Sequence, residues 1–148
     1  MKVVLDTNVL IAALIAHGVC TDVLEHCVRQ HTLATSDSIL NKFREHLVHK
    51  FKYSVEEAEE TVKLLGTRME VVTPADLGAA ICRDPDDDAV LGTAIAGGAA
   101  CIITGDDDLL VIRQFHTIDI VRPAEFAEYE AGKTRRTSKQ RSAGPPAP

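Results

Sequence analysis

The sequence predicts an α/β fold in three layers, with a central, mostly parallel sheet and helices on both of its faces. Short β-branched runs alternate with stretches of helical periodicity along residues 1–130. The strand-like runs are apolar throughout, which is typical of strands buried on both faces of a sheet. Apolar residues make up 45% of the 148 residues, enough for one domain with a real core.

In the first quarter of the chain, two predicted strands alternate with predicted helices. Residues 2–5 (KVVL) predict a short buried strand, and residues 8–16 have the composition of a buried helix. A second helix is expected over residues 21–30, because its apolar side chains recur on one face. Residues 32–35 (TLAT) predict a second, weaker strand.

The next two helices carry capping signals. Ser36 and Ser38 are both suited to cap a helix whose apolar residues follow at helical spacing. Ser54 and Glu57 form a capping-box pattern ahead of another helix that ends at Gly66.

The second half of the chain repeats the pattern. Apolar β-prone runs predict three strands, at residues 69–72, 100–103 and 117–121. Two helices are expected between them, at residues 89–96 and 107–115. Pro123 suits the first position of a closing helix, because its missing N–H is not needed there.

Charge is distributed unevenly. Residues 131–148 hold five bases and no acid, and end in Gly and Pro, so we expect a basic, Pro/Ser-rich disordered tail behind a domain of residues 1–130. The net charge of −6 therefore hides a body with 11 bases and 22 acids. Divalent metal ions on clustered carboxylates would allow so acidic a body to bind nucleic acid. The alternative is that the body does not contact nucleic acid.

Aspartates gather after the predicted strands. Asp6 ends the first strand, residues 84–88 (DPDDD) precede an apolar helix, and residues 106–108 follow the strand at 100–103. Sites in parallel sheets form beyond the carboxyl ends of the strands, so these acids should meet at one edge. Packed carboxylates repel, and a hard divalent cation with oxygen ligands relieves this.

The clusters leave two interpretations open. An aspartate before a helix is also a good N-cap, so each cluster alone fits a purely structural role. Histidine and cysteine are absent from the three clusters, which favours Mg²⁺ or Mn²⁺ over zinc. The four cysteines form no CxxC pair and are expected to be reduced, packed thiols.

Three motifs, in this order, resemble the strongest motifs of PIN domains: VLDTNVLIAAL at residues 4–14, RDPDDDAVLGTA at 83–94 and IITGDDDLL at 102–110. SILNKFREHLVHKF and IDIVRPAEF also fit, so the resemblance covers residues 1 to about 130. Within the family the chain is similar to the prokaryotic virulence-associated-protein-C-like group, toxins of type II toxin–antitoxin pairs.

The resemblance implies an endoribonuclease that uses Mg²⁺ or Mn²⁺ at an acidic site. Carried over by position, the metal-binding and catalytic acids are Asp6, Asp87 and Asp106, with Asp108 as a helper ligand. Asn8 resembles the residue that orients the first acid, and Thr104 the small polar residue before the last. The partners that it implies are RNA, an antitoxin protein and a second copy of the chain.

The chain departs from the family at one position. The pattern S-x-x-I-L-x-E usually supplies a glutamate, but here it ends in Lys42. Glu45, three residues on, lies on a neighbouring part of the same helix and could replace it. Alternatively, Lys42 places a cation in the pocket. This departure keeps open a degenerate PIN domain that binds RNA or protein without cutting. A phosphotransfer receiver has less support, because no lysine follows the last site-bearing strand.

The remaining features predict little chemistry. The acid run at residues 56–60 reads as a solvated helix face, and His26, His46 and His49 as surface or core-edge residues. The apolar run at residues 3–16 is interrupted by polar residues and is shorter than a bilayer span, so we expect a cytoplasmic protein with no membrane segment.

Overall fold

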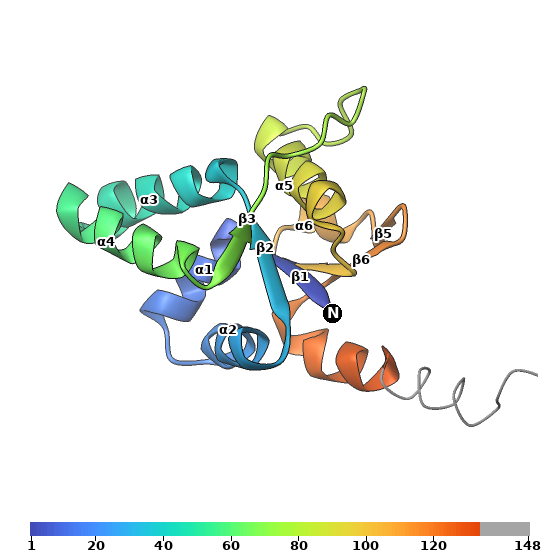
Figure 1. The fold of residues 1–148 in the computed structure, drawn as a ribbon, viewed down its shortest axis with the longest axis horizontal. Helices are drawn as coiled ribbons and strands as arrows, with labels where there is room; N and C mark the ends of the chain where they lie inside the picture. The colour runs from blue at the N-terminus through green and yellow to red at the C-terminus, as the bar shows by residue number, and fades with distance from the viewer. Residues whose placement is uncertain (134–148) are drawn as a thin grey trace, which may run out of the picture.

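The fold is built on a six-stranded sheet with the strand order β3-β2-β1-β4-β6-β5 (Figure 1). The computed structural model describes residues 1–133. Neighbouring strands are parallel except for β5, which runs antiparallel to β6 at one edge. The strands are β1 (Lys2–Leu5), β2 (Thr32–Thr35), β3 (Met69–Val71), β4 (Cys101–Ile103), β5 (Gln114–Phe115) and β6 (Ile118–Val121).

Helices cover both faces of this sheet, which confirms the predicted α/β class. The helix α5 packs on β1 and β2 from one face, while α1, α2 and the C-terminal helix lie on the other (Figure 1). The helices are α1 (Thr7–Ile15), α2 (Val19–Gln30), α3 (Asp37–Phe51), α4 (Val55–Gly66), α5 (Pro85–Gly97) and α6 (Asp107–Leu110). A 3₁₀ turn, Pro123–Glu125, leads into the C-terminal helix, which includes the described residues 126–133.

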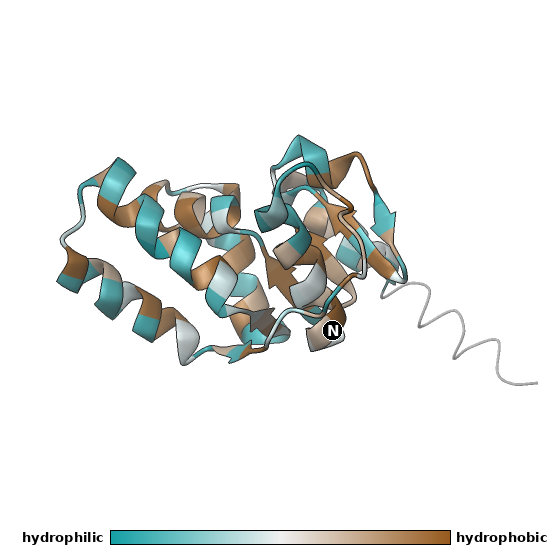
Figure 2. Ribbon diagram, turned by 90° about the horizontal axis from the view of Figure 1, so that it is seen from above, coloured by the Kyte–Doolittle hydropathy of each residue, from teal (hydrophilic) through white to brown (hydrophobic). Residues whose placement is uncertain are grey.

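The core is the apolar interior of the sheet. Val3 and Val4 are fully buried at its centre, and Val3 pairs with Leu33 on one side and with Cys101 on the other. Figure 2 shows hydrophobic strands near the centre of the molecule, with helices around them that carry both hydrophobic and hydrophilic residues. All four cysteines are free, in agreement with their expected role as reduced thiols.

The caps predicted at Ser36 and Ser54 are present, whereas Ser38 lies inside α3. The Ser36 hydroxyl accepts a hydrogen bond from the Ile39 amide at 3.4 Å and begins α3. Ser54 and Glu57 form the complete capping box of α4, with bonds of 3.0 and 3.1 Å. These contacts satisfy amide groups that a helix leaves without partners in its first turn.

The helix predicted over residues 107–115 is wrong. The helix α6 ends at Leu110, and residues 114–115 turn back to form β5 beside β6. Arg113 and His116 adopt positive φ angles of 63° and 54°, which a continuous helix does not allow. The buried Leu109 and the 76% exposed Val111 show why the apolar pattern misled: it belongs to one helical turn and a hairpin.

Other boundaries also differ from the sequence prediction, and α2, for example, begins at Val19 rather than at residue 21. The helix α5 begins at Pro85, four residues before the predicted start, because the Asp84 carboxylate accepts from the Asp86 amide and caps it. Residues 131–133, assigned to the tail, continue the C-terminal helix. The rest of the predicted tail, residues 134–148, lies outside the described residues.

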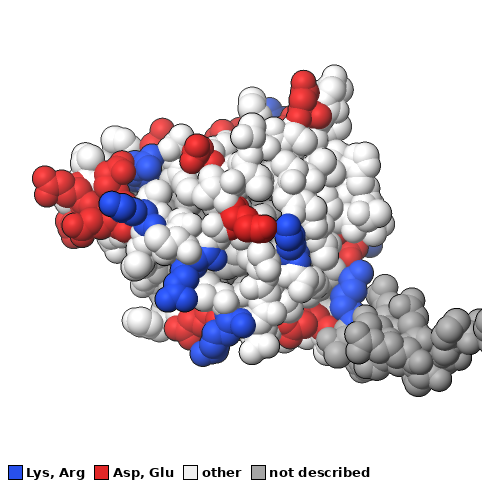
Figure 3. Space-filling view, in the orientation of Figure 1, with Lys and Arg blue, Asp and Glu red and all other residues white. Residues whose placement is uncertain are grey.

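Acidic side chains gather over the α3–α4 end of the molecule (Figure 3). They include exposed glutamates of α4, among them Glu56 and Glu57, as expected for a solvated face. Within residues 1–133 no single helix is long and apolar enough to cross a membrane; α1 and α2 reach that length and composition only as a pair, bent by 107°.

Candidate metal centre

Asp6 stands at the carboxyl end of the central strand β1. Its amide continues the ladder with β4 by donating to the Ile103 carbonyl at 3.0 Å. Its carboxylate then caps α1, since the Thr7 amide donates to Asp6 Oδ1 at 2.7 Å. Asp6 is only 5% exposed. The strand-to-helix transition thus fixes a buried acid at the edge of the sheet.

Asp106 is placed in the same way after the neighbouring strand β4. Its amide donates to the Thr104 hydroxyl at 3.0 Å, and its carboxylate accepts from the Asp108 amide at 3.0 Å, which caps α6. Because β1 and β4 are adjacent and parallel, Asp106 and Asp6 share one edge of the sheet.

Asp87 reaches this edge from the first turn of α5. It is 3% exposed, whereas Asp86 before it is exposed and Asp88 after it is half-buried. Asp87, Asp6 and Asp106 each offer one carboxylate oxygen, and these three atoms lie within 4.8 Å of one another. The proximity expected from the three motifs is therefore present, while their role as ligands stays a prediction.

Neighbouring donors fix the Asp6 carboxylate. Asp6 Oδ2 accepts from Asn8 Nδ2 at 3.1 Å and from the Thr104 hydroxyl at 2.8 Å. Asn8 Oδ1 in turn accepts from the Gly105 amide at 3.1 Å. With two donors on Oδ2 and one on Oδ1, a lone pair of Oδ1 stays available for a cation. Asn8 thus contacts the acid that its motif position suggests it orients, and Thr104 makes a contact with Asp6 that its position did not suggest.

The protonation of the cluster shows the cost of packing carboxylates together. Burial raises the pKa of Asp6, although hydrogen bonds from Thr104 and Thr7 lower it. The pKa of Asp87 is raised to about 7 by burial, then by a hydrogen bond with Asp106 and by the charges of Asp106 and Asp6. Without a cation the cluster therefore retains a proton near neutral pH.

The donor set fits a hard divalent cation. Octahedral Mg²⁺ with ligands at about 2.1 Å separates neighbouring oxygens by about 3 Å and opposite ones by about 4 Å. Three carboxylate oxygens within 4.8 Å reach these separations with small side-chain shifts. A bound cation would also supply the positive charge that, in its absence, the proton on Asp87 supplies.

Comparison with known families decides the classification. A sequence profile described as "PIN domain" matches residues 2–108. The chain belongs to the PIN-domain family. Among curated proteins, "Uncharacterized protein MJ1680" of Methanocaldococcus jannaschii is 32% identical over 141 residues, an alignment covering 86% of this chain and 90% of that protein.

Solved structures share the PIN fold. The chain resembles VapBC2 from Rickettsia felis bound to a DNA fragment from its promoter, with a TM-score of 0.61, 17% identity and coverage of 82% of this chain and 98% of that one. VapBC-1 from nontypeable Haemophilus influenzae gives a TM-score of 0.60, 17% identity and coverages of 84% and 99%. DNA-bound VapBC from Salmonella typhimurium gives 0.57, 16%, 83% and 98%. At these identities the likeness shows the fold alone.

Lys42, which occupies the glutamate position of this PIN domain, lies at the rim of the acidic cluster. Its Nζ is 3.5 Å from Asp86 Oδ2, and its side chain is 32% exposed. Burial lowers the pKa of Lys42, but the charges of Asp86 and Asp6 raise it above its ordinary value overall. The ammonium therefore stays charged beside the carboxylates.

Glu45 and Asp108 do not join the cluster. Glu45 is exposed on α3, and among the described residues it belongs to no group of side chains close enough together to hold a metal ion. Asp108 pairs instead with Arg83, with 2.7 Å between Arg83 Nη2 and Asp108 Oδ1. The structure thus brings together three of the five predicted acids and places the other two on its surface.

Three contacts around the site were not anticipated from the sequence. The buried Thr93 hydroxyl lies 2.8 Å from Ser36 Oγ and joins α5 to the start of α3. Asp88 accepts from the amides of Ile81 and Cys82 and holds the loop before α5. Only the caps at Ser36 and Asp84 gave a sequence signal for this region, because the other contacts join segments distant in the chain.

Proposed function

We propose that this PIN domain is a divalent-metal-dependent endoribonuclease and the toxin of a toxin–antitoxin pair. The observation that carries the proposal is the convergence of the Asp6, Asp87 and Asp106 oxygens within 4.8 Å at the carboxyl edge of the sheet. The three carboxylates come from the three motifs that resemble those of PIN domains, and their closeness favours a function beyond helix capping.

These three aspartates would hold Mg²⁺ or Mn²⁺. When bound, such a cation would activate water for attack on a phosphodiester and stabilise the developing negative charge. Asn8 and Thr104 keep the Asp6 carboxylate in one orientation. The amino ends of α1 and α5 open at this edge, and helix amino ends attract phosphate oxygens. Lys42 adds a fixed positive charge at the rim.

An antitoxin partner is the second part of the proposal. It is supported by likeness to three solved structures of VapBC, two of them bound to DNA. The target would be RNA, the location cytoplasmic, and the functional unit a homodimer, as the resemblance to the virulence-associated-protein-C-like group implies.

One observation favours a second candidate, a degenerate PIN domain that binds RNA or a protein without cutting. Lys42 supplies an ammonium beside the cluster where the family pattern supplies a carboxylate. The positive charge of Lys42 beside the carboxylates weakens the binding of a metal cation there by charge repulsion. The two candidates differ in whether RNA is cut.

Incubation of the full chain with a mixed RNA pool tests the proposal. We expect cleavage with Mg²⁺ or Mn²⁺, none with EDTA, and loss of cleavage in Asp106→Asn. Asp107→Asn is the matched control, because Asp107 is adjacent but has a 91% exposed side chain outside the cluster. RNA binding without metal-dependent cleavage by the wild type would favour the degenerate domain.

A further inference from the structure

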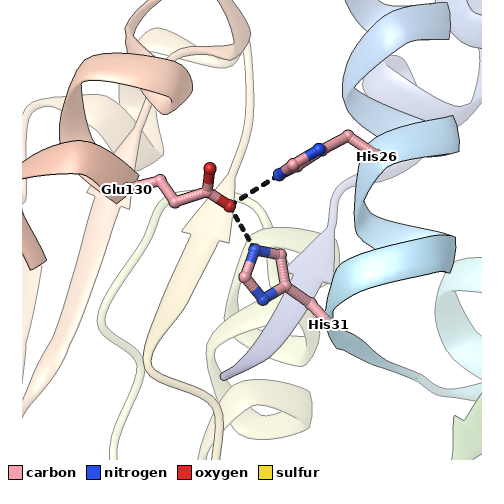
Figure 4. A group of neighbouring side chains, drawn as sticks. All are labelled: His26, His31 and Glu130. Atoms are coloured by element: carbon pink, nitrogen blue, oxygen red, sulfur yellow. Dashed lines mark hydrogen bonds and ion pairs between the residues drawn. The ribbon is translucent and has the colours of Figure 1, made fainter. Parts of the chain in front are cut away.

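Three metal-ligating side chains meet far from the acidic cluster (Figure 4). His26 lies on α2, His31 follows α2, and Glu130 reaches them from the C-terminal helix. Glu130 Oε2 lies 2.7 Å from His26 Nε2 and also contacts His31 Nε2. The three ligand atoms lie within 4.8 Å of one another. Two imidazoles and one carboxylate therefore point at one small volume.

This histidine–glutamate cluster lies at the amino ends of the parallel strands, opposite the carboxyl ends where the acidic cluster lies. His31 directly precedes β2, so it lies at the amino end of the parallel strands, whereas Asp6 follows β1 at their carboxyl end. A four-residue strand separates the two edges by roughly 13 Å. The proposed nuclease chemistry therefore does not use His26, His31 or Glu130.

The donor set differs in kind from the acidic one. Two imidazole nitrogens and one carboxylate oxygen are ligands typical of zinc, with a fourth position left for water. We propose that His26, His31 and Glu130 bind one Zn²⁺ ion, which fastens the C-terminal helix to α2. The acidic cluster, with oxygen ligands alone, takes the harder cation, so the two sites select different metals.

The two imidazoles are held in place before any ion arrives. Their ring centroids are 5.5 Å apart in an edge-on arrangement. Each ring also meets the edge or face of Phe126, at 6.4 Å for His26 and 5.9 Å for His31. Phe126 is 2% exposed, and the side chain of His31 is 11% exposed. The packed His31 ring therefore loses little freedom on binding a cation, whereas the His26 side chain is 40% exposed and is held by its contacts with Phe126 and Glu130.

Solvent reaches the cluster from one side. A cavity of about 350 Å³ lies between α2 and the C-terminal helix, and its lining includes His26, Glu130 and Asp22. This opening provides an entry path for the ion and room for a water in the fourth position. Asp22, one helical turn before His26, adds negative charge to that opening.

Zinc binding requires a particular tautomer of His31. Coordination through Nε2 places the ring proton on Nδ1, which lies 3.2 Å from the Met1 amino group. That contact is exposed to solvent, so the amino group can turn toward water when Nδ1 carries the proton. The geometry therefore accommodates the metal-bound tautomer without disturbing a buried contact.

Calorimetric titration with ZnCl₂ tests the proposal. The full chain is used without a polyhistidine tag, in a buffer with excess Mg²⁺ for the acidic cluster. We expect one Zn²⁺ per chain with micromolar or tighter affinity, weakened about tenfold or more in His31→Gln and in Glu130→Gln. His49→Gln is the matched control, because His49 is an exposed histidine on α3, and it should bind zinc as the wild type does.

A second measurement covers the case in which His31→Gln fails to fold. With Co²⁺ in place of zinc, the wild type should show visible absorption bands of a four-coordinate ion. The His26→Gln variant should lose them, and it is expected to fold because the His26 side chain is half-exposed. Asp87→Asn should leave zinc binding unchanged, which separates this site from the nuclease proposal. Absence of stoichiometric zinc binding, or an equal loss in His49→Gln, would overturn the proposal and leave a hydrogen-bonded contact.

Discussion

Lys42 Nζ lies 3.5 Å from Asp86 Oδ2, so the cation that replaces the family glutamate is paired at the rim of the acidic cluster. Asp86 directly precedes Asp87, and the ion pair therefore joins α3 to the first turn of α5. The charge of Asp6 also raises the pKa of Lys42, so the ammonium interacts with the acidic cluster as well as with Asp86. The lysine in place of the family glutamate thus adds a positive charge beside the three carboxylates.

Lys42→Glu is expected to raise the affinity for Mn²⁺ several-fold or more. The change removes a positive charge whose pKa shows that it interacts with Asp6, and it restores the carboxylate of the family pattern. Calorimetry with Mn²⁺ measures the effect. Lys50→Glu, in the last turn of the same helix, is the control for a charge change alone. Equal affinities for wild type and Lys42→Glu would show that Lys42 does not influence the cluster.

Glu45→Gln should change neither Mn²⁺ affinity nor RNA cleavage. The sequence left open that Glu45 replaces the missing glutamate, but its side chain is exposed and lies outside the three-carboxylate group. Parallel calorimetry and cleavage assays check this. A clear loss in either would mean that α3 shifts to bring Glu45 to the metal.

Thr104→Val should weaken Mn²⁺ binding by about 10- to 100-fold, the usual cost of losing a contact that orients a ligand. The variant keeps the shape of Thr104 but removes the 2.8 Å hydrogen bond to Asp6 Oδ2. Titration by calorimetry measures the change. Thr61→Val serves as control, because the Thr61 hydroxyl donates to a helix carbonyl on the exposed face of α4. An unaltered affinity in Thr104→Val would contradict the orienting role.

Asp87→Asn should stabilise the metal-free protein above neutral pH. The pKa of Asp87 is raised to about 7, chiefly by burial, so the folded state holds this proton more tightly than the unfolded chain does. The protonated Asp87 carboxyl therefore stabilises the fold fully below the pKa of the unfolded chain, about 3.9. This stabilisation is lost as the pH rises through the pKa of about 7 in the folded protein.

Urea unfolding with EDTA over this pH range provides the measurement. After allowance for solvent screening, the wild type should lose about 1–3 kcal/mol more than Asp87→Asn between acidic and weakly basic pH. Asp107→Asn should follow the wild type, since Asp107 is exposed. Parallel curves for wild type and Asp87→Asn would show that the carboxyl group is not strained by its neighbours.

Local sequence signals were enough to locate the acidic cluster. Asp6 and Asp106 follow apolar strands, and parallel strands bring such residues to one edge. The motif resemblance selected Asp87 from four neighbouring aspartates, and the structure shows it as the buried one of the run. The alternative reading also holds in part, because Asp6 and Asp106 cap helices while they face the cluster.

Contacts between distant segments were beyond such signals. Glu130 is 104 residues from His26, and the two histidines are five apart on the chain, which is no helical ligand spacing. Helical periodicity also could not reveal that Arg113 turns the chain into the β5–β6 hairpin, because that turn depends on backbone angles and pairing with β6. Burial and pairing in the complete fold decide both features.

The most direct test of the central claim is anomalous diffraction from crystals of the full chain grown with Mn²⁺. We predict an anomalous peak at bonding distance from carboxylate oxygens of Asp6, Asp87 and Asp106, with Lys42 at its rim. Crystals of Asp106→Asn should lose this peak, while those of Asp107→Asn should keep it. Manganese absent from these three carboxylates at saturating concentration, with the cluster otherwise unchanged, would contradict the account.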